Sequence, residues 1–129
     1  MSAKNLIPAK TVLVVDDSML IRHSVCRYLE ERGFIVEAAT NGVEALTVLE
    51  HFVPDLIITD LSMPRMGGAE LITNLRHRTE LAKTPILILS ARRNADELAR
   101  ELPREIEAVI FKDIDIEEQL VRALAYATA

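Results

Sequence analysis

The sequence predicts a doubly wound α/β fold, in which helices cover both faces of a parallel β-sheet. Short and almost continuously apolar segments alternate with longer segments of helical periodicity, and this alternation occurs five times along the chain. The apolar segments show no regular alternation with polar residues, so we expect both faces of each strand to be buried. With 129 residues, the chain has the length of one domain with a substantial core.

The expected elements follow a short polar N-terminal arm at residues 1–10. The expected strands are residues 11–16, 35–39, 55–59, 85–90 and 108–111. The expected helices are residues 18–32, 42–52, 68–78, 95–102 and 115–127. Residues 11–127 therefore form one domain, and no internal repeat or linker indicates a second.

Glycine, proline and the spacing of apolar residues support these boundaries. Gly33 is a C-terminal stop for the first helix, and Asn41-Gly42 opens the second. Pro54 precedes the third strand and Pro85 begins the fourth, where a missing N–H is tolerated. Apolar residues recur every four positions in the first and last helices, which predicts one buried stripe on each: Ile21, Val25 and Leu29, then Leu120 and Leu124.

Composition and charge exclude several classes of function. The net charge of −5 argues against direct nucleic-acid binding, which requires a basic face. No apolar stretch approaches the roughly 20 residues of a membrane span, and the start of the chain lacks the apolar segment of a signal peptide. The single cysteine, Cys26, excludes an internal disulfide and is expected to pack in the core. We therefore expect a cytoplasmic protein that makes no contact with membranes. The three histidines fall on helices without ligand spacing and are expected on the surface: His23, His51 and His77.

Charged and hydroxyl side chains stand at the carboxyl ends of four expected strands. Asp16-Asp17 follows the first strand and Asp60 the third, while Ser90 and Lys112 end the fourth and fifth. The carboxyl ends of parallel strands share one edge of the sheet, where such folds carry their working sites. Two carboxylates about 4 Å apart repel each other by roughly 4 kcal/mol at an effective dielectric near 20. A raised pKa, a cationic side chain or a bound metal ion is needed to relieve that repulsion.

Three carboxylates with little sulfur or imidazole nearby form a hard oxygen site, which suits Mg²⁺ or Mn²⁺ better than zinc. Lys112 and Ser90 add a point charge and a hydroxyl donor, the groups that bind a phosphoryl oxygen. A carboxylate in this setting is itself a nucleophile that forms an aspartyl phosphate.

The chain resembles the receiver domain of two-component response regulators, including chemotaxis regulators, over about residues 11–127. The spacing agrees throughout, with 44 residues from Asp16 to Asp60, 30 more to Ser90 and 22 more to Lys112. The motifs that carry the resemblance are Asp16-Asp17-Ser18, the run from Asp60 to Gly68, Ser90-Ala91 and Phe111-Lys112. The resemblance implies a flavodoxin-like fold with five parallel strands in the order 2-1-3-4-5.

The resemblance also implies a role for each carboxylate. Asp60 would accept a phosphoryl group, in a Mg²⁺-dependent transfer, from the phosphohistidine of a histidine kinase or phosphotransfer domain. Asp17 and Asp60 would coordinate the metal directly, Asp16 largely through water, and Ser62 through its backbone carbonyl.

Other matched residues would turn phosphorylation into a signal. Lys112 would contact the phosphoryl oxygens, and Ser90 would move toward the phosphate and draw the following loop with it. The small side chain of Ala91 would leave access to the acyl phosphate. The read-out would be a downstream protein or an output domain, bound on the face of the fourth helix, fifth strand and fifth helix.

Such a domain is a signalling phosphoacceptor rather than an enzyme, expected as a monomer or weak homodimer. Because the chain ends after its last helix, we expect either a single-domain regulator or a fragment of a larger one.

Four departures from the family pattern bear on the signal. Asp113 stands where proline usually follows the lysine, and Val109 stands where an aromatic switch residue is common. The stretch from Pro103 to Glu107 lacks the usual glycine. Gly67-Gly68 replaces an acidic or amide residue before glycine, and predicts a freer loop. Together they predict altered loop geometry beside the lysine and an altered read-out.

Ser62 and Arg92 each stand two residues past a site residue, at positions that tune dephosphorylation in receivers. Arg92 would screen the acyl phosphate from water or help to bind it; a solvated arginine is an equally good interpretation. Arg22 is expected on a solvated helix face. The acidic residues Asp113, Asp115, Glu117 and Glu118 suit either a helix start or a partner-binding face.

Two other functions stay open. A pseudo-receiver would keep the fold and bind partners without a phosphorylation cycle. A hydrolase of the haloacid dehalogenase type also uses Mg²⁺ and an aspartyl phosphate, but carries Asp-x-Asp on its first strand rather than the adjacent Asp16-Asp17. Taken alone, either of these two residues would more often cap the following helix.

Overall fold

A computed structural model of the protein describes residues 10–91, 100, 106–112 and 115–127. The strands and helices occur in the expected order, with one additional short 3₁₀ helix. They are β1 (Thr11–Val15), α1 (Met19–Glu31), β2 (Ile35–Ala39), α2 (Gly42–Val48), β3 (Leu56–Asp60), α3 (Gly68–Arg76), η2 (Thr79–Leu81), β4 (Ile86–Ser90), β5 (Ala108–Phe111) and α5 (Ile116–Ala127). The helix expected at 95–102 lies outside the described residues except for Arg100.

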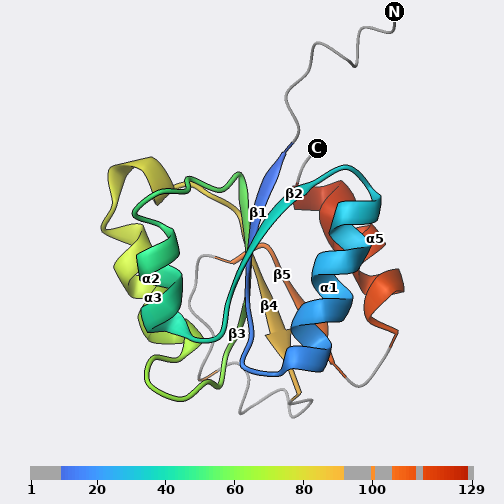
Figure 1. Cartoon of the computed structure of the whole chain (residues 1–129), viewed down its shortest axis with the longest axis horizontal. Coiled ribbons are helices and arrows are strands. Elements are labelled where there is room, and N and C mark those ends of the chain that lie inside the picture. The colour runs from blue at the N-terminus through green and yellow to red at the C-terminus, as the bar shows by residue number, and fades with distance from the viewer. Residues whose placement is uncertain (1–9, 92–99, 101–105, 113–114, 128–129) are drawn as a thin grey trace, which may run out of the picture.

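The five strands form one parallel sheet in the order β2-β1-β3-β4-β5, which confirms the predicted flavodoxin-like class and strand order. The sheet stands between two helical layers, with α2 and α3 on one face and α1 and α5 on the other (Figure 1). All the strands point the same way, so their carboxyl ends share one edge. At that edge Asp60 pairs in register with Leu89, and Ser90 pairs with Phe111.

The central strands β1, β3 and β4 are packed on both faces, as expected, whereas the edge strand β2 is mostly exposed and carries Glu37, so the expectation is wrong for β2. Val12 and Val14 of β1 belong to the core between the sheet and helices α1 and α5. Leu13 and Val15 of the same strand belong to the core on the α2 and α3 side. All four are fully buried, which explains why this strand is apolar after its first residue, Thr11.

Local hydrogen bonds set the ends of the first two helices. Ser18 caps α1, because its hydroxyl accepts a hydrogen bond from the backbone N–H of Ile21 at 3.3 Å. Asn41 caps α2 and accepts from the N–H of Glu44 at 2.9 Å. Gly33, with φ of +89°, follows α1 as the expected stop.

The second helix is shorter than expected, since it ends at Val48 rather than at residue 52. Glu50 and His51 donate to carbonyls three residues back, at Thr47 and Val48, so a tighter turn replaces the last helical turn.

Cys26 is half-buried against the core on the α1 side, as expected for a packing residue. Burial, together with the nearby charge of Glu30, raises the pKa of its thiol to about 11, so the reactive thiolate is scarce at neutral pH. The three histidines are exposed, as expected: His23, His51 and His77. Among the helices that the structure describes, none combines the length and apolarity needed to cross a bilayer.

Candidate functional site

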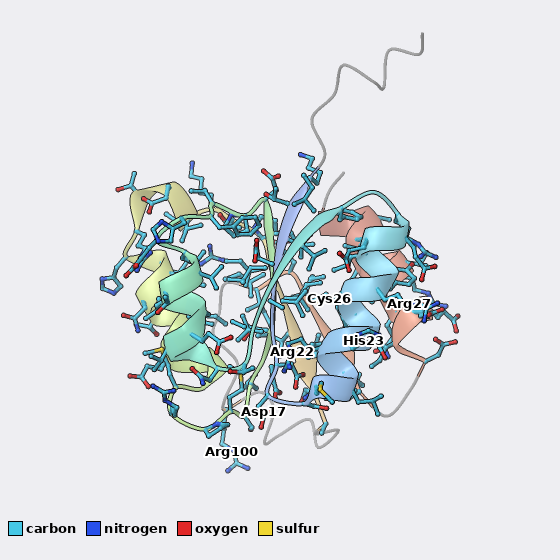
Figure 2. All side chains as sticks on the ribbon, in the orientation of Figure 1. Asp17, Arg22, His23, Cys26, Arg27 and Arg100 are labelled. Atoms are coloured by element: carbon cyan, nitrogen blue, oxygen red, sulfur yellow. The ribbon has the colours of Figure 1, made fainter. Side chains whose placement is uncertain are left out.

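The predicted site residues that the structure describes lie together at the carboxyl edge of the sheet. Asp16 follows β1, Asp60 and Ser90 are the last residues of β3 and β4, and Lys112 follows β5. Asp16, Asp60 and Ser90 are buried, whereas Asp17 is exposed. Figure 2 shows Asp17 at this edge, beside the loop that leaves β1. The site therefore has a buried floor and one carboxylate open to solvent.

Lys112 joins the two buried carboxylates. Its ammonium nitrogen Nζ lies 2.8 Å from Oδ2 of Asp16 and 3.1 Å from Oδ2 of Asp60. Burial alone would lower the pKa of Lys112, but hydrogen bonds and charge attraction from Asp16 and Asp60 outweigh burial and raise it. The lysine is therefore a permanent cation at neutral pH.

Asp60 is an unusually basic carboxylate. Burial, followed by repulsion from Asp16, raises its pKa to about 6, although Lys112 and the backbone of Ser62 oppose the rise. The opposing hydrogen bond from Ser62 is long, with its N–H nitrogen 3.4 Å from Oδ1 of Asp60. A carboxylate that ionises near pH 6 is a better nucleophile than an ordinary aspartate, and at pH 7 it is still largely ionised.

The three carboxylates fit a hard divalent cation. One oxygen from each of Asp16, Asp17 and Asp60 lies within 4.8 Å of the others. Asp16 is held by a hydrogen bond from the N–H of Ser18 to its Oδ1, at 2.8 Å. Its buried Oδ2 lies 2.8 Å from the Lys112 ammonium, which balances its negative charge. A cluster of carboxylate oxygens of this kind, with Asp17 exposed, suits Mg²⁺ or Mn²⁺.

This geometry predicts that metal affinity depends on pH. Because Asp60 must be ionised to bind a cation and has a pKa of about 6, the affinity for Mg²⁺ should be about tenfold weaker at pH 5 than at pH 7.5. Isothermal titration calorimetry measures the affinity directly. The variant Asp60→Asn should lose most of this pH dependence, and an affinity that stays constant in the wild type would contradict the prediction.

Backbone hydrogen bonds join the loop between β3 and α3 to its surroundings, and the freer loop expected at Gly67-Gly68 stays a prediction. The N–H of Gly68 donates to the carbonyl of Leu61 at 2.9 Å, and the N–H of Gly42 donates to the carbonyl of Met66 at 3.0 Å. A Cβ atom on Gly68 would collide with the carbonyl oxygen of Asp60. Glycine is needed at position 68 because the backbones of Asp60 and Gly68 approach closely, with no room for a side chain.

Gly68→Ala should therefore destabilise the protein by about 2 kcal/mol or more, because the start of α3 must move away from the backbone of Asp60. Chemical denaturation measures the loss. Thr73→Ala, an exposed position of the same helix, serves as the control and should change stability by less than about 0.5 kcal/mol. Equal stability of Gly68→Ala and the wild type would show that the contact is easily relieved.

Two residues near the site were missed or misjudged from sequence. Arg22, expected on a solvated face, is partly buried and donates from its guanidinium to the backbone carbonyl of Asp16 at 2.7 Å. Gln119 of α5 hydrogen-bonds to the backbone of Phe111, next to Lys112. The signal for Arg22 was its place in the first turns of the helix that follows Asp16; no sequence pattern pointed to Gln119.

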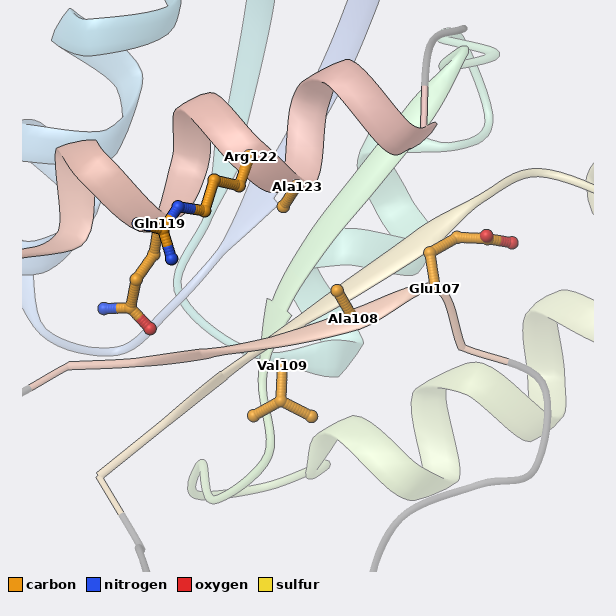
Figure 3. A pocket seen from close by; sticks show the side chains of 6 residues that line it. All are labelled: Glu107, Ala108, Val109, Gln119, Arg122 and Ala123. Carbon is orange, nitrogen blue, oxygen red and sulfur yellow. The ribbon is translucent and has the colours of Figure 1, made fainter.

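Val109, at the position of the usual aromatic switch, is half-buried on β5. An open groove of about 360 Å³ lies beside β5 and α5 and is lined by Glu107, Ala108, Val109, Gln119, Arg122 and Ala123. The Val109 side chain itself points away from α5 (Figure 3) and packs against the core on the α2 and α3 side. Arg92 and Asp113, and most of the stretch from Pro103 to Glu107, lie outside the described residues.

Comparison with known proteins shows which family and fold the chain is similar to. A family model described as the response regulator receiver domain matches residues 12–125. The chain is 35% identical over 105 residues to Regulator of RpoS from Escherichia coli (strain K12), covering 81% of this chain and 31% of that protein. It is 37% identical over 114 residues to Response regulator MprA from Mycobacterium sp. (strain KMS), covering 88% of this chain and 49% of that protein. The chain thus spans a third to a half of the length of these curated relatives.

A solved structure of a response regulator is similar to this chain over nearly the full length of both. The chemotaxis response regulator CheY4 of Vibrio cholerae superposes on this chain with a TM-score of 0.83 at 31% identity, covering 92% of this chain and 98% of that one.

Proposed function

The chain belongs to the response regulator receiver domain family, and from this premise we propose that it accepts a phosphoryl group from a histidine kinase or phosphotransfer domain onto Asp60. A receiver domain is a signalling domain rather than a classical enzyme. One observation carries the proposal: the Lys112 ammonium lies between the carboxylates of Asp16 and Asp60, at the edge where Asp17 adds a third. This arrangement supplies a nucleophile, a cation and a metal-binding face within one site.

In the proposed transfer, an oxygen of the Asp60 carboxylate attacks the phosphorus of a phosphohistidine. A P–O bond forms, the P–N bond breaks, and its electron pair stays on the histidine ring nitrogen. Lys112, already within 3.1 Å of the Asp60 carboxylate, then shifts its hydrogen bonds onto the phosphoryl oxygens and stabilises their charge. Ser90, buried at the end of β4, supplies a hydroxyl donor from the neighbouring strand.

Asp17 and Asp60 would hold Mg²⁺ directly, with Mn²⁺ as a substitute, Asp16 through water, and Ser62 through its backbone carbonyl. When bound, the cation neutralises negative charge on the carboxylates and on the transferred phosphoryl group. Asp16 keeps the site acidic, and its buried position fixes the lysine. Ser62 and Arg92, the second of which lies outside the described residues, are proposed to tune how fast water removes the phosphoryl group.

The family acts with histidine kinases and output domains, and we propose that this domain signals through the β5 and α5 side. Val109 of β5 lacks the large ring of an aromatic switch residue, and its side chain points away from α5 (Figure 3), toward the core on the α2 and α3 side. The read-out would then depend on movement of the Ser90 and Lys112 backbones rather than on the rotation of a ring.

The direct test is incubation with acetyl phosphate and Mg²⁺ at pH 7.5, followed by intact mass spectrometry. The wild type should gain one phosphoryl group, and chelation of the metal with EDTA before the incubation should prevent the gain. A chain that binds Mg²⁺ but never gains a phosphoryl group would refute the proposed transfer. A chain that neither binds Mg²⁺ nor gains a phosphoryl group would instead be a scaffold that binds partners.

A further inference from the structure

The side-chain amide of Gln119 makes two hydrogen bonds to one backbone residue. The N–H of Phe111 donates to Oε1 of Gln119 at 2.8 Å, and Nε2 of Gln119 donates to the carbonyl of Phe111 at 2.8 Å. Figure 3 shows the Gln119 side chain leaving α5 toward the end of β5. The amide therefore pairs with Phe111 as a neighbouring strand would, with one donor and one acceptor.

These bonds lie on the outer side of the sheet. In the strand order β2-β1-β3-β4-β5, the strand β5 is at the edge. The N–H of Lys112 points inward and donates to the carbonyl of Ser90 on β4 at 2.9 Å. Backbone groups of successive strand residues point to opposite sides, so those of Phe111 point outward, where Gln119 meets them. The end of β5 is thus held from both sides.

The held residue directly precedes Lys112, whose ammonium must reach both Asp16 and Asp60. The lysine side chain is only 15% exposed, so it has little room to correct a displaced backbone. We propose that Gln119 is a positioning residue: through the backbone of Phe111 it fixes the place of Lys112 in the phosphoryl-transfer site. This rests on the proposed function as far as phosphoryl contact is concerned.

Glutamine is suited to this role because it offers both a donor and an acceptor at the end of a side chain that spans the gap from α5 to β5. Leucine has a similar volume and a high helix propensity but makes neither bond. Gln119→Leu should therefore preserve α5 while releasing the strand end. A merely structural residue would change stability by an amount that does not depend on Lys112.

The test is a double-mutant cycle of Gln119→Leu and Lys112→Ala. Without metal, Lys112→Ala should lower the equilibrium constant for folding. The factor by which it does so should be about fivefold smaller in the Gln119→Leu background than in the wild type, because the lysine there is already misplaced. With acetyl phosphate and saturating Mg²⁺, Gln119→Leu should slow phosphorylation about fivefold or more, and change it less than twofold when Lys112 is already alanine. Denaturant titration and intact mass spectrometry measure the two quantities.

Asn74→Ala is the matched control, since the Asn74 amide also donates to a backbone carbonyl, that of Glu70 at 2.9 Å, but on α3 and away from Lys112. It should show no coupling to Lys112→Ala. Independent effects of Gln119→Leu and Lys112→Ala on stability would overturn the inference, as would an unchanged phosphorylation rate in Gln119→Leu. If the wild type is not phosphorylated at all, the proposed function fails, while the stability cycle still decides whether Gln119 positions Lys112.

Discussion

Asp60→Asn is expected to remove all phosphoryl gain from acetyl phosphate and, without metal, to make the fold more stable at pH 8. The first effect follows because the amide oxygen of asparagine is a poor nucleophile and no second carboxylate occupies the Asp60 position. Intact mass spectrometry under conditions that phosphorylate the wild type measures it. Asp55→Asn is the control, because an asparagine still accepts hydrogen bonds from Thr11 at the opposite end of β3. This control should gain a phosphoryl group like the wild type.

The second effect follows from the raised pKa of Asp60. In the folded state its pKa is about 6, against an ordinary value of 3.8, so the folded protein binds more protons between about pH 4 and pH 6. Stability therefore falls as the pH rises through that window, and the full cost is present above it. A shift of about two units corresponds to about 2 to 3 kcal/mol, which the uncharged asparagine removes. The stabilisation should vanish near pH 4, and a variant that is less stable than the wild type at pH 8 would contradict this reasoning.

Lys112→Ala is expected to have the opposite effect on stability and a large effect on transfer. Without the ammonium, the buried carboxylates of Asp16 and Asp60 face each other unpaired, which should destabilise the metal-free protein by about 3 kcal/mol at pH 8. The pKa of Lys112 is raised, so its stabilising charge is fully present at pH 8 and would be lost only at strongly alkaline pH. Phosphorylation by acetyl phosphate should slow about a hundredfold, because one charged donor to the transferred group is missing.

The pH dependence separates this cause from simple loss of packing. At pH 5 Asp60 takes up a proton, the repulsion is relieved, and the destabilisation by Lys112→Ala should shrink. Chemical denaturation at the two pH values measures the difference. Lys83→Ala, at an exposed lysine, should have little effect at either pH. A destabilisation of the same size at both pH values would mean that lost contacts, rather than charge, explain the effect.

The two variants, Asp60→Asn and Lys112→Ala, concern the same balance between the stability of the fold and the function proposed for Asp60. Burial and repulsion from Asp16 disfavour the charge of Asp60, and Lys112 relieves only part of that cost. The protein therefore sacrifices stability at the residue that we propose as the phosphoryl acceptor, as functional sites commonly do.

The sheet and the residues at its edge could be predicted from the sequence because both depend on local signals. Continuously apolar strands, Gly33 and Asn41-Gly42 located the first elements closely. Once the strands are parallel, Asp16, Asp60 and Lys112 must lie at the same edge of the sheet. That they meet there depends also on the strand order, which the family resemblance implies.

The rest depends on how helices pack on the sheet, which single-residue patterns do not encode. Gln119 sits on a helix whose apolar stripe predicts its buried side but not which polar residue meets the end of β5. From the sequence, Arg22 is an ordinary surface cation. Only the position of α1 in the structure shows that its guanidinium donates a hydrogen bond to the carbonyl of Asp16. Gly68 suggests freedom in isolation, and only the contact with the Asp60 backbone shows that it serves close packing.

The central claim is that Asp60 carries the phosphoryl group, and chemical trapping tests it most directly. The wild type is incubated with acetyl phosphate and Mg²⁺ and then reduced with borohydride, which converts an aspartyl phosphate to homoserine, and the product is mapped by peptide mass spectrometry. We predict homoserine at position 60 and an unchanged aspartate at positions 16 and 17. Homoserine at another position, or none despite a confirmed gain of phosphoryl mass, would contradict the assignment of Asp60 as the acceptor.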